Sequence, residues 1–539
     1  MNATGGALVE QGDRPGLKLV TKNNNGVARL TPAPPEGDLA DSPLFPAAAR
    51  RELGNETQRK NLHHAMTTIR TKRARVTAEL DNWEELRQAG EAIKNRTIRH
   101  LDSYLEQLEA SLTAAGTTVH WARDAKEANE IIVGLVKGKL AGEPYQEVVK
   151  VKSMATQEID MNEALEANGV AAWETDLAEL IVQMGHDRPS HILVPAIHRN
   201  RSEVREIFLD EMGNYGKAAP EDLDTEPKNL AAASRAHLRE KFMRAKVAIS
   251  GANFAVAETG TLCVVESEGN GRMCLTLADT LISVVGIEKI VPTFADLEVF
   301  LQLLPRSSTA ERMNPYTSLW TGPREGDGPQ EMHVVLIDNG RTDVLTDPVG
   351  REALRCIRCS ACINVCPVYE KVGGHAYGSV YPGPIGAVLT PQLRSMKNPV
   401  DRSLPFASSL CGACNDVCPV KIPLMQLLVH ERNKAVEAKK ADHKRYSVHF
   451  EPTAMKATSV MFGNGKLWGA ALGAETNLGG KVLGRFFDHF GPIPGPLNRW
   501  LGARDVPMVP TQSFRAWWDA HEKEVQATAP VEAPKGEKK

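Results

Sequence analysis

The chain has 539 residues, of which 42% are hydrophobic and 24% charged, as in ordinary soluble globular proteins. At roughly 150 residues per domain, this length predicts two to four domains. The 64 basic and 67 acidic side chains leave a formal net charge of −3, which gives no support for a nucleic-acid-binding protein. No run approaches the roughly 18 apolar residues of a transmembrane helix, and the N-terminus lacks a secretory signal, so we expect a cytoplasmic protein.

The N-terminal part of the chain is expected to form a tail and a helical arm. Residues 1–45 are rich in Gly, Pro, Ala and Asn and show little periodicity, which predicts a disordered tail. Residues 46–85 predict a basic helical arm. Its basic side chains include Arg50, Arg51, Arg59, Lys60, Arg70, Lys72, Arg73 and Arg75. They form either a solvated helical face, which is the commoner case, or a docking surface for an acidic partner.

Residues 86–345 alternate helical patterns with short apolar runs, which indicates an α/β domain. A helix is predicted from Leu101 to Leu112, where leucines and Tyr104 recur on one face, and it stops at Gly116. Strands are predicted at 117–121, 148–153, 191–197, 262–267, 281–287 and 333–338. Continuous apolar runs between helices are typical of a largely parallel, buried sheet with helices on both faces.

A small, mostly helical domain is predicted over 346–440. Asp347 and Pro348 resemble a helix N-cap followed by proline at the first helical position. A second helix is expected after Pro423, running toward Lys439.

Residues 441–539 are expected to form a separate C-terminal region that ends in a polar, Lys-rich tail. Phe514, Trp517 and Trp518 are spaced to share one face of a helix. This aromatic face either packs against the same chain or contacts a partner.

The cysteines carry the strongest signal, because seven of the nine lie between Cys356 and Cys418. Such clustering in a cytosolic chain indicates metal or redox chemistry. The first motif is C-x2-C-x2-C-x3-C-P and contains Cys356, Cys359, Cys362, Cys366 and Pro367. The second motif matches its last three cysteine positions and contains Cys411, Cys414, Cys418 and Pro419, with Ser408 where the first cysteine would stand.

This is the pattern of bacterial two-cluster ferredoxins, in which the fourth cysteine binds the other cluster. The crossed rule assigns Cys356, Cys359, Cys362 and Cys418 to cluster one, and Cys366, Cys411 and Cys414 to cluster two. We therefore expect two [4Fe–4S] clusters that relay electrons. The second cluster has only three cysteine ligands, so it is either a site-differentiated [4Fe–4S] cluster or a three-iron cluster. Zinc is the alternative, but zinc sites usually use two separated cysteine pairs.

Other candidate residues give weaker signals, and the sequence identifies no catalytic residue. Cys263 and Cys274 are expected to be buried structural cysteines, and His375 is a minor candidate for a cluster ligand. The turns at 258–261 and 268–272, which carry Glu258 and Glu268, either line a ligand crevice or serve as plain turns. No flavin or nicotinamide fingerprint is present.

Four segments together resemble the lactate utilisation protein B family, the iron–sulfur subunit of a bacterial L-lactate utilisation system. They are AETGTLCVVESEGNGRMC, VVLIDNGR, CIRCSACINVCPVYEKVGGHAYGSVYPGPIGAVLTP and SSLCGACNDVCPVKIPL, and the resemblance extends over roughly residues 90–520. It implies an N-terminal lactate-utilisation (LUD) domain, related to sugar isomerases and CoA-transferases, and an alpha-helical ferredoxin domain. It also implies that the family's cluster ligands correspond to the seven cysteines of the two motifs.

The resemblance further implies a cytoplasmic three-component system that oxidises L-lactate to pyruvate. Its other members are a cysteine-rich subunit resembling heterodisulfide reductases and a second LUD protein. We therefore expect a non-catalytic electron-transfer subunit. The alternatives are electron transfer for glycolate or another 2-hydroxy acid, a transferase- or isomerase-type enzyme, and a scaffold in which the clusters only support the fold.

Overall fold

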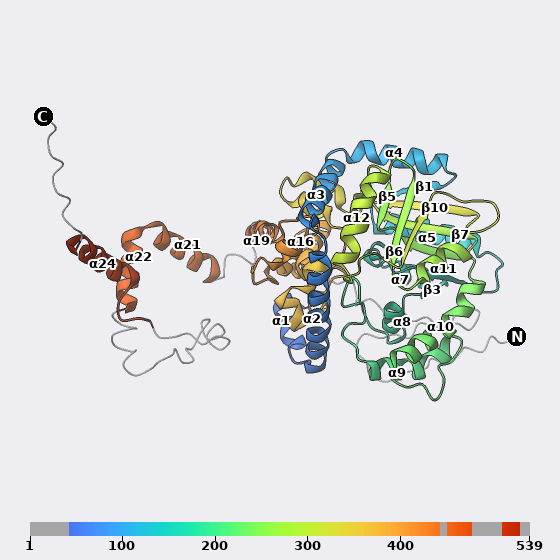
Figure 1. The fold of residues 1–539 in the computed structure, drawn as a ribbon, viewed down its shortest axis with the longest axis horizontal. Coiled ribbons are helices and arrows are strands. Elements are labelled where there is room, and N and C mark those ends of the chain that lie inside the picture. The colour runs from blue at the N-terminus through green and yellow to red at the C-terminus, as the bar shows by residue number, and fades with distance from the viewer. Residues whose placement is uncertain (1–42, 442–449, 477–508, 529–539) are drawn as a thin grey trace. The chain divides into compact units, whose positions relative to one another are not determined.

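The computed structural model describes residues 43–441, 450–476 and 509–528. The expected disordered tail therefore lies almost entirely outside the described residues. The chain divides into two compact units, Met1–Ala438 and Lys439–Lys539, which are described separately (Figure 1).

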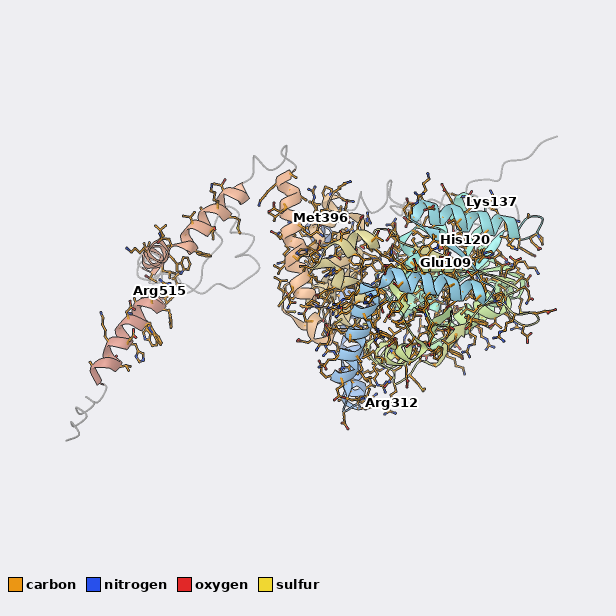
Figure 2. All side chains as sticks on the ribbon, turned by 90° about the horizontal axis from the view of Figure 1, so that it is seen from above. Glu109, His120, Lys137, Arg312, Met396 and Arg515 are labelled. Atoms are coloured by element: carbon orange, nitrogen blue, oxygen red, sulfur yellow. The ribbon has the colours of Figure 1, made fainter. Side chains whose placement is uncertain are left out.

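The first unit begins with four helices: α1 (Phe45–Glu52), α2 (Glu56–Ala78), α3 (Trp83–Arg99) and α4 (Leu101–Ala114). The Asn55 side chain caps α2 by accepting from the Gln58 backbone N–H. Helices α1 to α3 pack against the cysteine-containing region, whereas α4 lies along the edge of the main sheet. There the Trp121 indole donates to Glu109 of α4 over 3.1 Å, near the edge-strand residue His120 (Figure 2).

The main sheet has six parallel strands, which confirms the predicted architecture. Its strands are β1 (Thr118–Ala122), β2 (Glu147–Lys150), β3 (Ala171–Glu174), β4 (Val247–Gly251), β7 (Thr280–Gly286) and β10 (Glu331–Ile337). Their order is β1-β10-β7-β4-β2-β3. Every residue of β7 is buried, as expected for a strand with both faces covered.

Helices cover both faces of this sheet. They are α5 (Ala125–Lys139), α6 (Met154–Glu158), α7 (Met161–Ala167), α8 (Leu177–Met184), α9 (Arg201–Glu211), α10 (Pro227–Arg244) and α11 (Asn270–Leu277). Helix α12 (Phe294–Ser307) packs instead against α2 and α3. Because side chains alternate along a strand, Ala248 packs with α8 to α11 while its neighbours Val247 and Ile249 pack with α5 and α7.

A second, four-stranded sheet of mixed direction was not predicted. It contains β5 (Phe254–Val256), β6 (Thr261–Glu266), β8 (Ile290–Val291) and β9 (Tyr316–Trp320), in the order β8-β5-β6-β9. The predicted strand at 262–267 lies here, between two antiparallel neighbours. An apolar run alone does not distinguish the two sheets, because both bury it.

The strand predicted at 191–197 is wrong. This segment forms turns between α8 and α9. The His191 imidazole accepts the backbone N–H groups of Leu193 and Val194, each over 3.1 Å, and Pro195 has none to donate. The backbone donors that a sheet would need are therefore used locally.

The cysteine-containing region consists of helices, most of them short. They are α13 (Arg341–Thr346), η4 (Gly350–Arg355), α14 (Ala361–Asn364), α15 (Pro367–Val372), η5 (His375–Tyr377), α16 (Gly383–Arg394), α17 (Pro399–Ser403), η6 (Leu404–Phe406), α18 (Ala413–Val417) and α19 (Leu424–Ala441). Two further 3₁₀ turns, η2 (Met212–Tyr215) and η3 (Ile287–Lys289), lie in the α/β domain.

The two predicted helix starts in this region had different outcomes. Helix α19 begins directly after Pro423, as predicted. The helix predicted from Pro348 is wrong in type and start: a 3₁₀ helix begins at Gly350. The Asp347 carboxylate accepts from the N–H groups of Val349 and Gly350. These hydrogen bonds stabilise a turn at 347–349, so the helix begins only after it.

The second unit is described in three helices: α21 (Phe450–Gly463), α22 (Gly465–Glu475) and α24 (Phe514–Thr528). Phe514, Trp517 and Trp518 share one region of α24, and their side chains are 69%, 46% and 49% exposed. Across the described ranges, no helix combines the length and the apolar character needed to cross a membrane.

Candidate iron–sulfur site

The first cysteine motif forms a tight loop between η4 and α15. Arg358 and Ser360 both adopt left-handed backbone conformations, with φ of 59° and 61°. Such conformations are unfavourable for non-glycine residues and persist where the surroundings require them. They curl the chain so that three thiols are presented within one loop. Pro367 then starts α15, and the Cys366 thiol accepts from the Tyr369 N–H over 3.5 Å.

The second motif repeats this design on α18. Leu410 and Gly412 have positive φ, 55° and 85°, and turn the chain into the short helix. The thiol of Cys418 accepts from the Ile422 N–H over 3.3 Å. Cys411 is the exposed member of the motif, whereas Cys414 and Cys418 are buried.

The fold brings the seven cysteines into two adjacent sets. Cys359 and Cys362 interact electrostatically with Cys356 and Cys418. Cys366 and Cys414 interact with Cys411. Most of these interactions run within two sets, Cys356, Cys359, Cys362 and Cys418 in one and Cys366, Cys411 and Cys414 in the other. Cys362 and Cys414 also interact, so the two sets are neighbours.

The chemistry of these thiols fits iron–sulfur clusters. Burial and the adjacent Cys418 and Cys356 raise the pKa of Cys359 to about 12, and burial raises the pKa of Cys418 to about 11. Thiols this hard to ionise bind metal only when the metal displaces the proton. Backbone N–H groups already point at the sulfurs of Cys356, Cys366 and Cys418, where they would stabilise a thiolate.

Arginines from three parts of the sequence surround the four-cysteine set. Arg73 of α2 donates to the Val417 carbonyl over 2.8 Å, and Arg87 of α3 donates twice to the Cys418 carbonyl, over 3.1 and 3.0 Å. Arg355 interacts with Cys418, and Arg358 with Cys356. Part of the predicted basic arm thus faces the cysteine motifs of its own chain.

Arg358 is also part of a buried ionic network that joins the cysteine-containing region to the α/β domain. Its guanidinium donates to Glu288 over 3.2 Å and lies 4.7 Å from the centre of the Tyr381 ring. Glu288 also pairs with Arg341, which pairs with Glu158. Burial alone would raise the pKa of Glu288, but Arg341 and Arg358 hold it well below its usual value. Sequence reasoning missed this network because its members are far apart in the chain.

The other candidates named from the sequence lie elsewhere or serve local structure. Cys274 lies beside the Thr175 hydroxyl, 3.4 Å away, and Cys263 is buried in the apolar core; burial raises the pKa of each to about 12. His375 contacts the Arg188 carbonyl over 2.8 Å and packs on His198. The Ser408 hydroxyl accepts from the Leu410 N–H over 3.1 Å.

The two glutamate turns have structural partners. Glu258 accepts from the Phe294 N–H at the start of α12, over 2.9 Å, and Glu268 accepts from the Leu177 N–H at the start of α8, over 3.0 Å. Burial and the nearby Asp176 raise the pKa of Glu268 to about 7. These contacts favour the plain-turn interpretation.

Comparison with known proteins agrees with this geometry. The family model of the LUD domain matches residues 105–337, and that of the 4Fe-4S dicluster domain matches residues 352–422. The second match spans both cysteine motifs, so the chain contains an iron–sulfur domain.

Curated relatives match most of the chain. "Lactate utilization protein B" of Oceanobacillus iheyensis is 43% identical over 475 residues, which cover 87% of this chain and 95% of the relative. "Lactate utilization protein B 1" of Bacillus mycoides is 43% identical over 88% of this chain and 95% of its own length. The "Uncharacterized electron transport protein YkgF" of Escherichia coli is 40% identical over 89% of this chain and 97% of its own length. At this identity and coverage, the chain belongs to the lactate utilization protein B family.

Proposed function

We propose that the chain is an electron-transfer subunit of a complex that oxidises L-lactate to pyruvate, and that it carries two [4Fe–4S] clusters. Cluster one would be held by Cys356, Cys359, Cys362 and Cys418, and cluster two by Cys366, Cys411 and Cys414. The observation that carries the proposal is the arrangement of these cysteines in two neighbouring sets. The names of the relatives, which refer to lactate utilization and electron transport, support it.

The electron balance is consistent with two one-electron centres. Oxidation of a 2-hydroxy acid to a 2-keto acid releases two electrons and two protons. Each cluster, when bound, stores one electron. The chain's own residues then set the environment: Arg73, Arg87 and Arg358 place positive charge near cluster one, and the apolar core that contains Ile357 and Ile363 excludes water.

The exposure of the cysteines suggests a direction for partner contact. Cys411 is exposed, whereas the four thiols proposed for cluster one are buried. Electron transfer to or from another protein would therefore occur at the cluster-two side. The proposed partners are a cysteine-rich subunit resembling heterodisulfide reductases and a second LUD protein, acting together in the cytoplasm.

Glycolate or another 2-hydroxy acid as substrate of the complex would use the same relay. A transferase or isomerase activity of the α/β domain is less well supported, because Glu258 and Glu268 hold helix starts.

The proposal is tested by deleting the chain and reintroducing variants of it. Deletion of this chain from a strain without other lactate dehydrogenases should abolish growth on L-lactate. The Cys356→Ala variant, reintroduced into this strain, should not restore growth. Cys263→Ala, a buried cysteine outside both motifs, is the matched control and should restore growth. The isolated chain should not oxidise lactate with an artificial acceptor. Robust lactate oxidation by the chain alone would overturn the assignment.

A further inference from the structure

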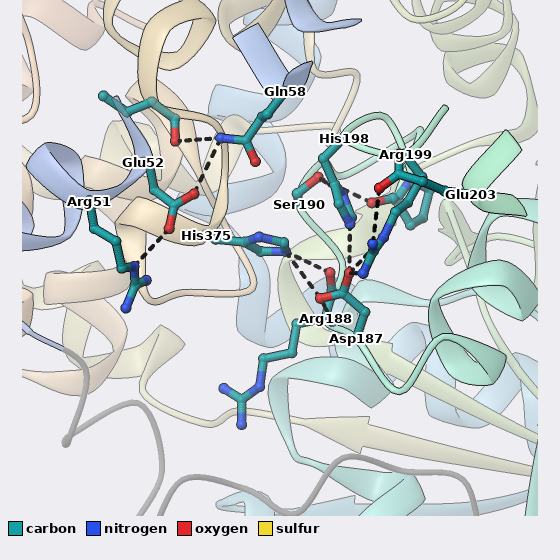
Figure 3. A network of polar contacts seen from close by, with 12 residues as sticks. Arg51, Glu52, Gln58, Asp187, Arg188, Ser190, His198, Arg199, Glu203 and His375 are labelled. Atoms are coloured by element: carbon teal, nitrogen blue, oxygen red, sulfur yellow. Dashed lines mark hydrogen bonds and ion pairs between the residues drawn. The ribbon is translucent and has the colours of Figure 1, made fainter. Parts of the chain in front are cut away.

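Three metal-ligating side chains converge outside the cysteine motifs. Asp187 and His198 lie on the loop between α8 and α9, and His375 begins η5 (Figure 3). Nε2 of His198 lies 2.8 Å from one carboxylate oxygen of Asp187, and Nε2 of His375 lies 3.9 Å from the other. Each residue offers one ligand atom, and the three atoms lie within 4.8 Å of one another.

These three side chains come together because the backbone before η5, in the cysteine-containing region, lies very close to the α8–α9 loop of the α/β domain. A Cβ atom on Gly374 would lie 1.8 Å from the Ser190 carbonyl oxygen, so only glycine allows η5 to approach the loop this closely. The Tyr369 hydroxyl donates to the same carbonyl over 2.6 Å. The fold therefore holds His375 against Arg188 of this loop, 187 positions away in sequence.

We propose that Asp187, His198 and His375 bind a divalent first-row transition-metal ion. Two imidazoles and one carboxylate are a donor set that suits Zn²⁺ and Fe²⁺ alike. At bond lengths of about 2.0–2.1 Å, tetrahedral ligands stand roughly 3.3 Å apart. The two histidine nitrogens lie 2.8 and 3.9 Å from different oxygens of Asp187, and one ligand atom from each residue lies within 4.8 Å of the others, so the side chains would close around the ion on binding.

The contacts of His198 leave its Nε2 facing the carboxylate. Nδ1 of His198 lies 2.7 Å from the Ser190 hydroxyl, which also donates to the Pro195 carbonyl over 3.2 Å. Nε2 lies 2.8 Å from Oδ2 of Asp187. A metal ion would take the place of the proton shared by these two atoms, with the Ser190 hydroxyl behind the histidine as the orienting partner.

The remaining contacts of the site are compatible with a metal. Arg199 donates to one oxygen of Asp187 over 3.1 and 2.6 Å, and the Arg188 N–H donates to the other over 2.7 Å. These bonds orient the carboxylate. Nε2 of His375 lies 2.8 Å from the Arg188 carbonyl, and a proton on Nε2 makes this contact a hydrogen bond. A metal ion would bind Nε2 by displacing this proton.

A second cluster of potential ligands lacks these features. Asp347, His430 and Glu431 also come within ligand distance of one another. This second cluster offers only one imidazole, and the ammonium of Lys434 lies 3.1 Å from Asp347 and 3.3 Å from Glu431. This second cluster provides a matched control.

Three protein ligands leave at least one coordination position for water or an anion, as in catalytic rather than structural zinc sites. The bound ion would also tie the α/β domain to η5. That short helix carries Tyr377, which interacts with the Cys366 thiol. The site therefore lies close to the cluster-two ligands, although the proposal does not depend on electron transfer.

The experiment uses the full chain, purified anaerobically with its clusters, and titrates Zn²⁺ or Fe²⁺ alone. Bound metal is measured by elemental analysis after desalting, and zinc ligation by X-ray absorption at the zinc edge, which the cluster iron does not obscure. The expected result is one ion per chain beyond the cluster iron, with nitrogen and oxygen ligands including two histidines. His198→Ala and His375→Ala should each remove it at unchanged cluster iron, whereas His430→Ala should retain it.

Three results would overturn the proposal: no ion beyond the cluster iron in the wild type, zinc bound through sulfur, or zinc retained in both histidine variants. If His198→Ala does not fold, His375→Gln replaces it, because the His375 side chain is partly exposed. Retention of zinc by the folded His375→Gln variant would then contradict the proposal.

Discussion

Arg358, between the first two cysteines of the first motif, donates to Glu288 of the LUD domain over 3.2 Å, and both side chains are buried. The Arg358 N–H also lies 3.4 Å from the Cys356 sulfur. One residue thus connects the proposed cluster one with a charged group at the end of the parallel sheet. Glu288 also forms an ion pair with Arg341, so replacing Arg358 does not leave the Glu288 carboxylate unpaired.

This pair predicts opposite shifts in the reduction potential of cluster one. Reduction adds negative charge, so Arg358→Gln should lower the potential and Glu288→Gln should raise it. A change of about 1.4 kcal/mol corresponds to about 59 mV for one electron, and we expect shifts of roughly 50 mV. Potentiometric titration followed by electron paramagnetic resonance measures them. The exposed Arg123→Gln is the control, and shifts of equal sign in the two buried variants would contradict the electrostatic account.

The contact between Gly374 and Ser190 predicts a specific stability loss. A Cβ at Gly374 would meet a backbone oxygen at 1.8 Å, so Gly374→Ala should destabilise the protein by roughly 2–4 kcal/mol. A Cβ at Gly134 in helix α5 would meet no atom within 4 Å, so Gly134→Ala should be neutral or stabilise by up to about 1 kcal/mol. Anaerobic denaturant unfolding compares the two, and equal effects would show that the domains do not meet at Gly374.

The exposure of Cys411 predicts which cluster is lost first. Brief exposure to air should convert cluster two to a three-iron form, because this cluster has three thiolates and one of them is exposed. The three-iron signal in electron paramagnetic resonance should disappear on anaerobic addition of iron. Ser408→Ala should leave this behaviour unchanged, because the Ser408 hydroxyl is bonded to the Leu410 N–H.

Single ligand variants should separate the clusters. Cys411→Ala should lose cluster two and keep cluster one, and Cys356→Ala should do the reverse, as measured by iron content and spin quantitation. Equal air stability of both clusters, with no three-iron species at any time, would point to a fourth protein ligand for cluster two.

His191 predicts a dependence of stability on pH. It is fully buried between the domains, its Nε2 lies 3.1 Å from Asn364 Oδ1, and burial lowers its pKa to about 4. The unfolded chain takes up this proton near pH 6.5, so stability is full at neutral pH and falls as pH decreases from about 6.5 toward 4. Between pH 7 and 5 this amounts to about 2 kcal/mol. The free energy of unfolding of His191→Gln should fall less over this range, and identical slopes would refute the assignment.

The sequence allowed the parallel sheet and the loop of the first cysteine motif to be predicted, because each depends on local patterns. Buried strands such as β7 are continuous apolar runs, and the spacing of Cys356, Cys359 and Cys362 determines one loop. The run at 191–197 has the same apolar composition but forms turns. There, the side chain of His191 competes for the backbone donors, an interaction that periodicity does not reveal.

Contacts between distant segments could not be predicted from single motifs. The arginines near cluster one come from α2, α3 and η4, and the pairing of Arg358 with Glu288 joins residues 70 positions apart. Asp187 and His198 gave no signal of their own. The nearest sequence clue is His375 after two glycines, a minor candidate for a cluster ligand, and it lies against His198.

The most direct test of the electron relay is spin quantitation in the anaerobically isolated complex before and after addition of L-lactate. The account predicts that lactate produces the reduced signals of both clusters of this chain, and that Cys356→Ala abolishes the cluster-one signal. Formation of pyruvate while both clusters stay oxidised, under conditions in which dithionite reduces them, would contradict the proposed role.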